Sequence, residues 1–265
     1  MASFLALLAF LQTAGVHVER VAVPGPSGVT LDAALILPAG APTAPPILAM
    51  HGCGGPFPIR DGQWAVVMAR RGHIVLLPDS FGSRGLGSQC ANGFRSVTAK
   101  GARRDDAFAA ARWLAARAGN PAGGVAMMGW SDGGSTVLAT AAAASDLPPN
   151  LFLRFAAFYP GCRGFAPDLL WHPAAPLLIV MGESDDWTPA APCHQLTANH
   201  PNEIAMIAYP GAYHDFDAPG RPIKQRSGTT TQSGMATTGT NEPGRQDALA
   251  RVPGWLETGR LDPSR

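Results

Sequence analysis

Short apolar runs at intervals along the chain restrict its fold more than any other feature of the sequence. Each run is about five to eight residues long and carries at most one charged side chain. Runs of this kind are typical of strands that are buried on both faces of a parallel sheet. They occupy residues 46–50, 74–78, 125–129, 152–159, 177–181 and 204–209. Two earlier segments, residues 18–23 and 29–37, flank a Pro- and Gly-rich turn and predict an antiparallel pair.

Helical stretches separate most of these strands. Residues 97–118 carry apolar side chains at helical spacing, and residues 135–144 are rich in alanine, the best helix former. We also predict helices at 63–71, 191–199 and 246–256, and Pro253-Gly254 is expected to break or kink the last one. Because strands and helices alternate, we predict an α/β fold with about eight strands in a mostly parallel sheet and helices on both faces.

The chain is predicted to be one domain over residues 16–265. It has 265 residues, a length that single α/β domains routinely reach, and no stretch looks like an interdomain linker. Residues 227–240 (SGTTTQSGMATTGT) are polar and small, and we interpret them as a mobile loop or insertion without regular structure. Twenty basic and nineteen acidic side chains leave a net charge of +1, so nothing indicates nucleic-acid binding.

The N-terminal segment raises the question of targeting. Residues 4–11 (FLALLAFL) form an apolar run that is too short to span a bilayer, and small residues follow at Thr13, Ala14 and Gly15. No Lys or Arg precedes the run. We favour a signal peptide over residues 1–15 and hence an exported protein; the alternative is a buried N-terminal segment of a cytoplasmic protein.

Four cysteines are compatible with export. Cys53, Cys90, Cys162 and Cys193 form no C-x-x-C pair and have no spacing that suits zinc, so we expect no metal site. Two disulfides in an exported chain leave three connectivities open, and in the cytoplasm the same residues would be small buried hydrophobes. We prefer a Cys162–Cys193 pair because both residues follow neighbouring strands.

A candidate nucleophile lies in the G-x-S-x-G match Gly129-Trp130-Ser131-Asp132-Gly133. The motif directly follows a predicted strand and precedes the alanine-rich helix, where a nucleophilic Ser on a tight turn needs small neighbours. The helix N-terminus also favours a developing negative charge. The alternative is a Ser that only caps the helix. We therefore predict Ser131 as a nucleophile.

A glycine-rich loop, His51-Gly52-Cys53-Gly54-Gly55, follows the strand at 46–50. Ester hydrolysis passes through an oxyanion, which backbone N–H groups can stabilise. We assign this role to the amides of Cys53 and Asp132; the alternative for the loop is a turn with a core-facing Cys. The loop has no G-x-G-x-x-G pattern, so a dinucleotide site is not supported.

The partners of the nucleophile are expected in two later loops. Asp185 and Asp186 follow the strand at 177–181, and we favour Asp185 as the carboxylate that orients a histidine. His214 follows the last strand, from where it can reach back to Ser131. The order Ser131, Asp185, His214 is the Ser…Asp…His order of α/β-hydrolases.

The motifs resemble those of the dienelactone hydrolase family. The resemblance runs from about residue 20 to about residue 258 and rests on HGCGG, PDSFGSRG, GWSDGG, GESDDWTP and AYHDFD. It implies an α/β-hydrolase fold, a Ser131–His214–Asp185 triad, no cofactor, and a monomer or weak homo-oligomer that acts on a small-molecule ester or lactone. The family prototype has a Cys nucleophile and an Arg soon after the catalytic His that holds the substrate carboxylate. Here Ser131 stands at the nucleophile position, Arg221 comes later, and Arg84 loosely matches another anion-binding Arg.

We therefore predict a carboxylic ester hydrolase, similar to dienelactone hydrolase (carboxymethylenebutenolidase), that forms an acyl-enzyme. Besides Arg84, Trp130 and Trp187 are expected to contact the substrate together with Phe81; the alternative for each aromatic is a core position. Two other functions stay open, a catalytically inactive hydrolase-like binding protein and a small serine peptidase. No membrane span is expected.

Overall fold

The computed structural model describes residues 2–91, 93–117, 120, 122–143 and 148–261. Its main sheet has eight strands in the order β1-β2-β4-β3-β5-β6-β7-β8. Strand β2 pairs antiparallel with β1 and β4, and all other pairs are parallel. The predicted mostly parallel sheet is confirmed. The strands are β1 (His17–Pro24), β2 (Thr30–Leu37), β3 (Ile47–Met50), β4 (Val75–Pro78), β5 (Val125–Trp130), β6 (Phe152–Phe158), β7 (Leu177–Gly182) and β8 (Ile204–Tyr209).

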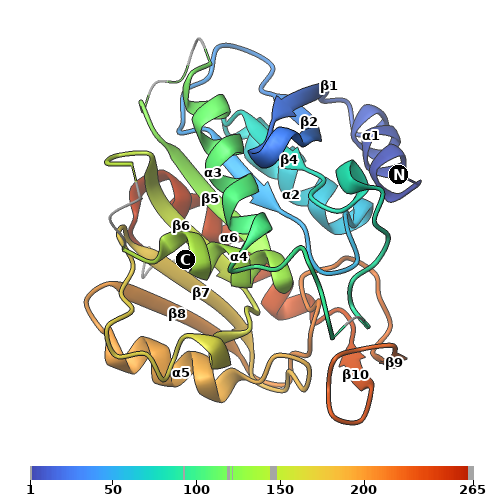
Figure 1. Cartoon of the computed structure of the whole chain (residues 1–265), viewed down its shortest axis with the longest axis vertical. Helices are drawn as coiled ribbons and strands as arrows, with labels where there is room; N and C mark the ends of the chain where they lie inside the picture. The colour runs from blue at the N-terminus through green and yellow to red at the C-terminus, as the bar shows by residue number, and fades with distance from the viewer. Residues whose placement is uncertain (1, 92, 118–119, 121, 144–147, 262–265) are drawn as a thin grey trace.

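Helices cover both faces of this sheet (Figure 1). The pair α3 and α4 packs on one face, α2 and α6 pack on the other, and α5 lies against β7 and β8. Two predicted helix ends, Ala118 and Ala144, lie outside the described residues. The helices are α1 (Ala2–Thr13), α2 (Pro58–Arg70), α3 (Ala102–Ala115), α4 (Asp132–Ala141), α5 (Ala190–Asn199) and α6 (Glu242–Thr258).

Helix α6 differs from the predicted helix over 246–256 because it begins at Glu242 and is not broken at Pro253-Gly254. The helix continues to Thr258 and stops before Gly259, whose φ of 72° suits glycine. Pro253 removes one backbone hydrogen bond, but the turn around it is buried against the sheet. Trp255 Nε1 donates to the Phe155 carbonyl at 2.9 Å. These tertiary contacts offset the local cost of the proline.

The polar segment 227–240 also differs from the prediction. It is not structureless, because β9 (Lys224–Ser227) and β10 (Met235–Thr238) form an antiparallel hairpin. Asp186 fixes the hairpin to the loop after β7, since its two carboxylate oxygens accept hydrogen bonds from Thr237 N at 2.7 Å and Thr237 Oγ1 at 2.8 Å. A loop contact, rather than an apolar pattern, therefore orders the segment.

Two disulfides join segments that lie far apart in the sequence. The predicted Cys162–Cys193 pair is confirmed, and Cys53 pairs with Cys90. The second disulfide ties the glycine-rich loop after β3 to the long connection between β4 and α3. It therefore restrains one of the loops at the carboxyl ends of the strands.

Helix α1 packs at the edge of the molecule, against α2 and β1 (Figure 1). Phe4, Leu7 and Leu11 are buried there, whereas Leu5 is 52% exposed. Among the helices that the structure describes, none combines the length and apolar character needed to cross a membrane. This packing is the buried alternative considered for residues 1–15, and the signal peptide stays a prediction.

Candidate active site

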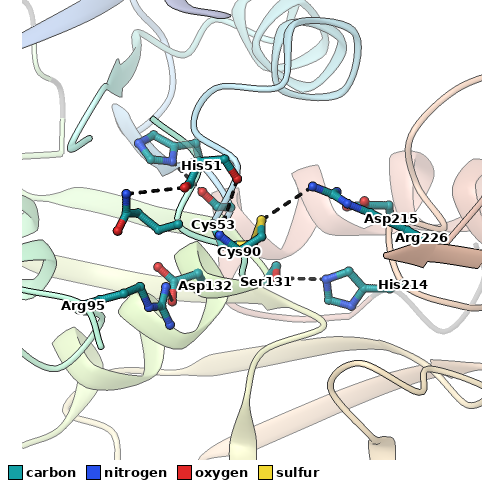
Figure 2. Close-up of a disulfide and its surroundings, with 12 residues drawn as sticks. His51, Cys53, Cys90, Arg95, Ser131, Asp132, His214, Asp215 and Arg226 are labelled. Carbon is teal, nitrogen blue, oxygen red and sulfur yellow. Dashed lines mark hydrogen bonds and ion pairs between the residues drawn. A yellow bond between two sulfur atoms is a disulfide. The ribbon is translucent and has the colours of Figure 1, made fainter. Parts of the chain in front are cut away.

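Three side chains from three different loops meet at the carboxyl ends of the parallel strands. Ser131 follows β5, Asp185 follows β7, and His214 follows β8. His214 Nε2 lies 2.9 Å from Ser131 Oγ, and His214 Nδ1 lies 2.7 Å from Asp185 Oδ2. Figure 2 shows Ser131 and His214 facing each other across this contact. The structure thus places a hydroxyl, an imidazole and a carboxylate in one hydrogen-bonded series.

Ser131 occupies a sharp turn between β5 and α4. Its φ of 55° and ψ of −115° are rare for a residue with a side chain. The Ser131 N–H donates to the Phe158 carbonyl at 2.9 Å, which holds the turn against β6. A Cβ atom on Gly129, Gly133 or Gly134 would collide with a backbone oxygen of a neighbouring segment. The glycines around Ser131 are therefore required by close backbone packing.

The two adjacent aspartates have different partners. Asp185 Oδ1 accepts hydrogen bonds from Trp187 N and Thr188 N, both at 2.9 Å, which leaves Oδ2 toward His214. Asp186 instead binds the β9–β10 hairpin. Asp185 is 4% exposed. Of the two, it is the aspartate that meets the histidine, as the sequence analysis favoured.

Burial and charge act in opposite directions on His214. Burial lowers the pKa of its imidazole, but the charge of Asp185 and the hydrogen bond to it raise the pKa, and the net pKa lies above the ordinary value of 6.5. The rings of Tyr159 and Trp187 flank His214, with centroids 4.6 and 4.8 Å away. The imidazole therefore has a fixed position and a stabilised protonated form.

The glycine-rich loop after β3 lies directly beside Ser131. A Cβ on Gly52 would be 3.6 Å from Ser131 Cβ. Burial lowers the pKa of His51 to about 3, so its imidazole is neutral. Its Nδ1 lies 2.8 Å from the Gly52 carbonyl oxygen, and its Nε2 accepts a hydrogen bond from the Ser80 N–H at 3.1 Å. Among the residues described, no backbone carbonyl accepts a hydrogen bond from the Cys53 N–H.

Asp132 is the first residue of α4, where helix N–H groups lack intrahelical acceptors. Burial raises the pKa of its carboxyl, but Arg103 and Arg95 lower it more, so the pKa lies below the usual range. Arg103 Nη1 lies 2.5 Å and Arg95 Nη1 lies 2.9 Å from the two carboxylate oxygens. Figure 2 shows the Asp132 side chain directed toward Arg95 and away from His214. Its carboxylate is therefore held by the two arginines and is not directed at His214.

A pocket of about 560 Å³ opens over Ser131 and His214. The loop after β3, the start of α2, the Cys53–Cys90 disulfide and the β9–β10 hairpin form its walls. Trp187 lines it, as predicted for a substrate contact. Its size suits a small ligand.

Cationic side chains are concentrated around this pocket. Arg221, Lys224 and Arg226 line it, and no salt bridge joins any of the three to a carboxylate within the described part of the chain. The Arg226 guanidinium lies 5.3 Å from the centroid of the Trp187 ring, and its Nη2 lies 3.7 Å from Cys90 Sγ. Arg226 approaches the disulfide in Figure 2. The pocket mouth is therefore electropositive.

A buried polar network supports the pocket floor. Arg60 Nη1 donates to Asp215 Oδ1 at 2.8 Å, and Arg60 also pairs with Asp61. Asp217 accepts hydrogen bonds from the Tyr159 hydroxyl at 2.7 Å and from the indole of Trp130 at 2.9 Å. Buried polar groups of this kind are costly unless paired. By binding Asp215 and Asp217, the network holds the segment that directly follows His214.

Three residues predicted near the substrate lie elsewhere. Trp130 is fully buried under the site and binds Asp217. Phe81 packs in the core against His51. Arg84 forms a bidentate ion pair with Asp106, at 2.7 and 2.8 Å. These residues do not line the pocket, because their side chains are committed to contacts within the protein.

The sequence analysis did not predict that Arg60, Lys224 and Arg226 line the pocket. Arg60 lies before the predicted helix start at 63, since the actual helix begins at Pro58. Lys224 and Arg226 are two positions apart on one strand, so they share a face. This spacing of two basic residues was the sequence signal that could have indicated a basic face on this segment. Within the residues described, no group of three or more His, Cys, Asp or Glu side chains is arranged to hold a metal ion.

Comparisons with known proteins fit this architecture. The sequence model of the dienelactone hydrolase family matches residues 31–259. No curated protein matches the chain in sequence.

Similar solved structures share the fold at low identity. A candidate dienelactone hydrolase from Klebsiella pneumoniae has a TM-score of 0.68 at 16% identity, over 91% of this chain and 98% of its own. The hyperthermophilic esterase of the archaeon Pyrobaculum calidifontis has a TM-score of 0.64 at 17% identity, over 98% of this chain and 92% of its own. Dipeptidyl peptidase 4 of Porphyromonas gingivalis has a TM-score of 0.58 at 19% identity, over 76% of this chain and 33% of its own. These likenesses show an α/β-hydrolase fold.

Proposed function

Because the chain belongs to the dienelactone hydrolase family and is therefore a hydrolase, we propose that it cleaves carboxylic ester or lactone bonds through an acyl-enzyme on Ser131. The observation that carries the proposal is the series Asp185–His214–Ser131, with contacts of 2.7 and 2.9 Å. This is the arrangement in which an imidazole can take a proton from a hydroxyl while a carboxylate holds its tautomer.

The proposed reaction has two steps. In the first, His214 Nε2 accepts the Ser131 proton as Oγ attacks the carbonyl carbon, and the resulting imidazolium protonates the leaving alcohol. In the second, His214 takes a proton from water as the water oxygen attacks the acyl carbon. The imidazolium then gives this proton to Ser131 Oγ as the bond from Oγ to the acyl carbon breaks, which releases the acid and restores the neutral histidine. A lactone follows the same steps with its alcohol still attached to the acyl group.

The backbone amides of Cys53 and Asp132 are the proposed donors to the oxyanion. The adjacency of the Gly52 backbone to Ser131 and the position of Asp132 at the start of α4 support this assignment. In both steps negative charge develops on the former carbonyl oxygen. Preorganised N–H groups stabilise that charge more in the transition state than in the ground state.

The electropositive mouth supports a preference for substrates with an anionic group. Arg221, Lys224 and Arg226 line the pocket together with the glycine-rich loop and belong to one segment around β9. A carboxylate on the acyl or alcohol part of an ester would find cations there without displacing an internal ion pair. Arg84, proposed from the sequence for anion binding, is instead occupied by Asp106.

Ser131→Ala tests the proposed function directly. We expect the variant to lose turnover of p-nitrophenyl acetate and labelling by a fluorophosphonate, because both need the Oγ nucleophile. Ser83→Ala is the matched control, since the Ser83 hydroxyl binds the backbone N–H of Asp32 outside the pocket, and it should keep both.

Three results would contradict the proposal. Full activity of Ser131→Ala would exclude the nucleophile. Cleavage of peptide p-nitroanilides in preference to all esters and lactones would make the protein a serine peptidase. Failure of the wild-type protein to turn over any member of a broad ester, lactone and peptide panel would favour an inactive binding protein.

A further inference from the structure

Arg103 is a buried cation that the two-step reaction does not employ. It lies in the first turn of α3, its side chain is 0% exposed, and it is absent from the pocket wall. Removing a guanidinium from water is costly unless strong partners compensate. Its partners therefore show what it holds in place.

The guanidinium binds two different loops at once. Nη1 lies 2.5 Å from Asp132 Oδ2, and Nη2 donates to the His51 carbonyl at 2.6 Å. The ring of Phe81 lies against the guanidinium, with the centroid 4.9 Å from Cζ. Asp132 begins α4, whereas His51 follows β3. One planar side chain thus spans the two segments.

These segments carry the two amides assigned to the oxyanion. The Cys53 amide lies two residues after His51, and the Asp132 amide belongs to the residue that Arg103 binds. The loop and the helix also touch directly, because a Cβ on Gly133 would lie 2.6 Å from the same His51 carbonyl. The carbonyl that Arg103 holds is therefore part of the interface that sets the spacing of the two amides.

We propose that Arg103 is a positioning residue that fixes the distance between the Cys53 and Asp132 amides by binding the His51 carbonyl and the Asp132 carboxylate together. This inference rests on the proposed ester hydrolysis and deepens it. Oxyanion stabilisation depends on donors that are placed before the reaction, and an error of about 1 Å can cost about 100-fold in rate.

Arg95 is a useful comparison because it binds the same carboxylate without the bridge. Its Nη1 contacts Asp132 Oδ1, and its side chain is 22% exposed. Arg95 therefore compensates charge on Asp132, and within the described part of the chain no hydrogen bond or ion pair joins its side chain to the loop after β3. If bridging matters, Arg103 should affect the reaction more than Arg95 does.

Arg103→Lys is the central test, because an ammonium keeps the charge but lacks the planar fork that reaches two acceptors. Measured with a short-chain p-nitrophenyl ester, kcat should fall about 10- to 100-fold while KM changes less than about threefold. The Ki of a trifluoromethyl ketone, which forms a tetrahedral oxyanion on the serine, should rise by the same factor as kcat/KM falls. Arg95→Lys should lower kcat by less than Arg103→Lys.

Arg104→Lys is the matched control. Arg104 is the next residue of α3 and also links α3 to α4, since its Nε donates to the Ala139 carbonyl at 3.1 Å, far along α4 from Ser131. It should keep kcat and the ketone Ki within about twofold of the wild type. A thermal melt of each variant separates loss of positioning from loss of fold.

Asp132→Asn serves as the second variant, because it weakens the other half of the bridge and leaves the Arg103–His51 contact. It should lower kcat, and the double variant Arg103→Lys/Asp132→Asn should lose less than the product of the two single losses. Unchanged kcat in Arg103→Lys, a loss confined to KM, or an equal loss in Arg104→Lys would overturn the inference. Ser131→Ala labelling is independent of these outcomes, so the proposed function can stand while the role of Arg103 fails.

Discussion

At the scale of single residues, His214 shows how the site balances two demands. Asp185 accepts from Nδ1 and Ser131 Oγ faces Nε2, so the ring is held by both nitrogens. Burial alone would keep the imidazole neutral and weaken it as a base, while the buried carboxylate stabilises the imidazolium that forms during reaction. A base of this kind works only when it is unprotonated at the start.

The activity should therefore depend on pH through His214. Because the pKa of His214 is raised above 6.5, kcat/KM for a neutral ester should increase with pH and level off only above that value. Asp185→Asn removes the main cause of the raised pKa and leaves burial, so the midpoint should move to lower pH and kcat should fall by about 10⁴-fold. Rate profiles of both proteins over about pH 5 to 9 measure this, and an unchanged midpoint in Asp185→Asn would show that Asp185 does not set the His214 pKa.

At the scale of elements, the β9–β10 hairpin adds charge to a pocket that the main sheet builds. Strand β9 places Lys224 and Arg226 on one face, and Asp186 anchors the opposite strand through Thr237. The serine, histidine and aspartate come from the sheet, whereas the cations come from this inserted segment. Substrate preference and bond cleavage are therefore expected to reside in different elements.

Removing the hairpin charges should affect anionic substrates selectively. We expect Lys224→Gln/Arg226→Gln to raise KM for an ester of a dicarboxylic acid about 10-fold and to leave a neutral acetate ester within about twofold, because exposed charges contribute about 0.2–1 kcal/mol each. Added salt should reduce the wild-type preference in the same direction. Arg70→Gln, at the end of α2 and outside the pocket, is the control. Equal losses on both esters would assign the cations a structural role.

The elements also show which parts of the structure a sequence can predict. Strands β3 to β8 were predicted because burial on both faces leaves an apolar run, and Ser131, Asp185 and His214 were predicted because each follows such a run. The hairpin was missed because its order comes from Asp186 and not from an apolar pattern. Arg103 was missed because its partners, Asp132 and His51, lie 29 and 52 positions away in the sequence. Arg60 was missed because the helix that carries it begins at Pro58, before the predicted start at residue 63.

At the scale of the whole molecule, the N-terminal helix and the disulfides bear on where the protein works. Two disulfides favour an oxidising compartment. Helix α1 buries Phe4, Leu7 and Leu11 but exposes Leu5, so it is apolar on all sides rather than amphipathic. That character is typical of the apolar region of a signal peptide. We therefore keep the proposal that the protein is exported.

If residues 1–15 are a leader, the exported protein should lack them and remain fully active. Helix α1 lines no part of the pocket over Ser131, so a chain that starts at Val16 should have kcat/KM within about twofold of the full chain. N-terminal sequencing and intact mass of the protein recovered from the periplasm or medium measure the cleavage.

Leu7→Arg, which places a charge inside the apolar run, should block export and leave the precursor inside the cell, whereas Leu7→Ile should not. Recovery of exported protein that still begins before Phe4 would contradict the leader, and the burial of Phe4, Leu7 and Leu11 against α2 would then make α1 a permanent part of the fold.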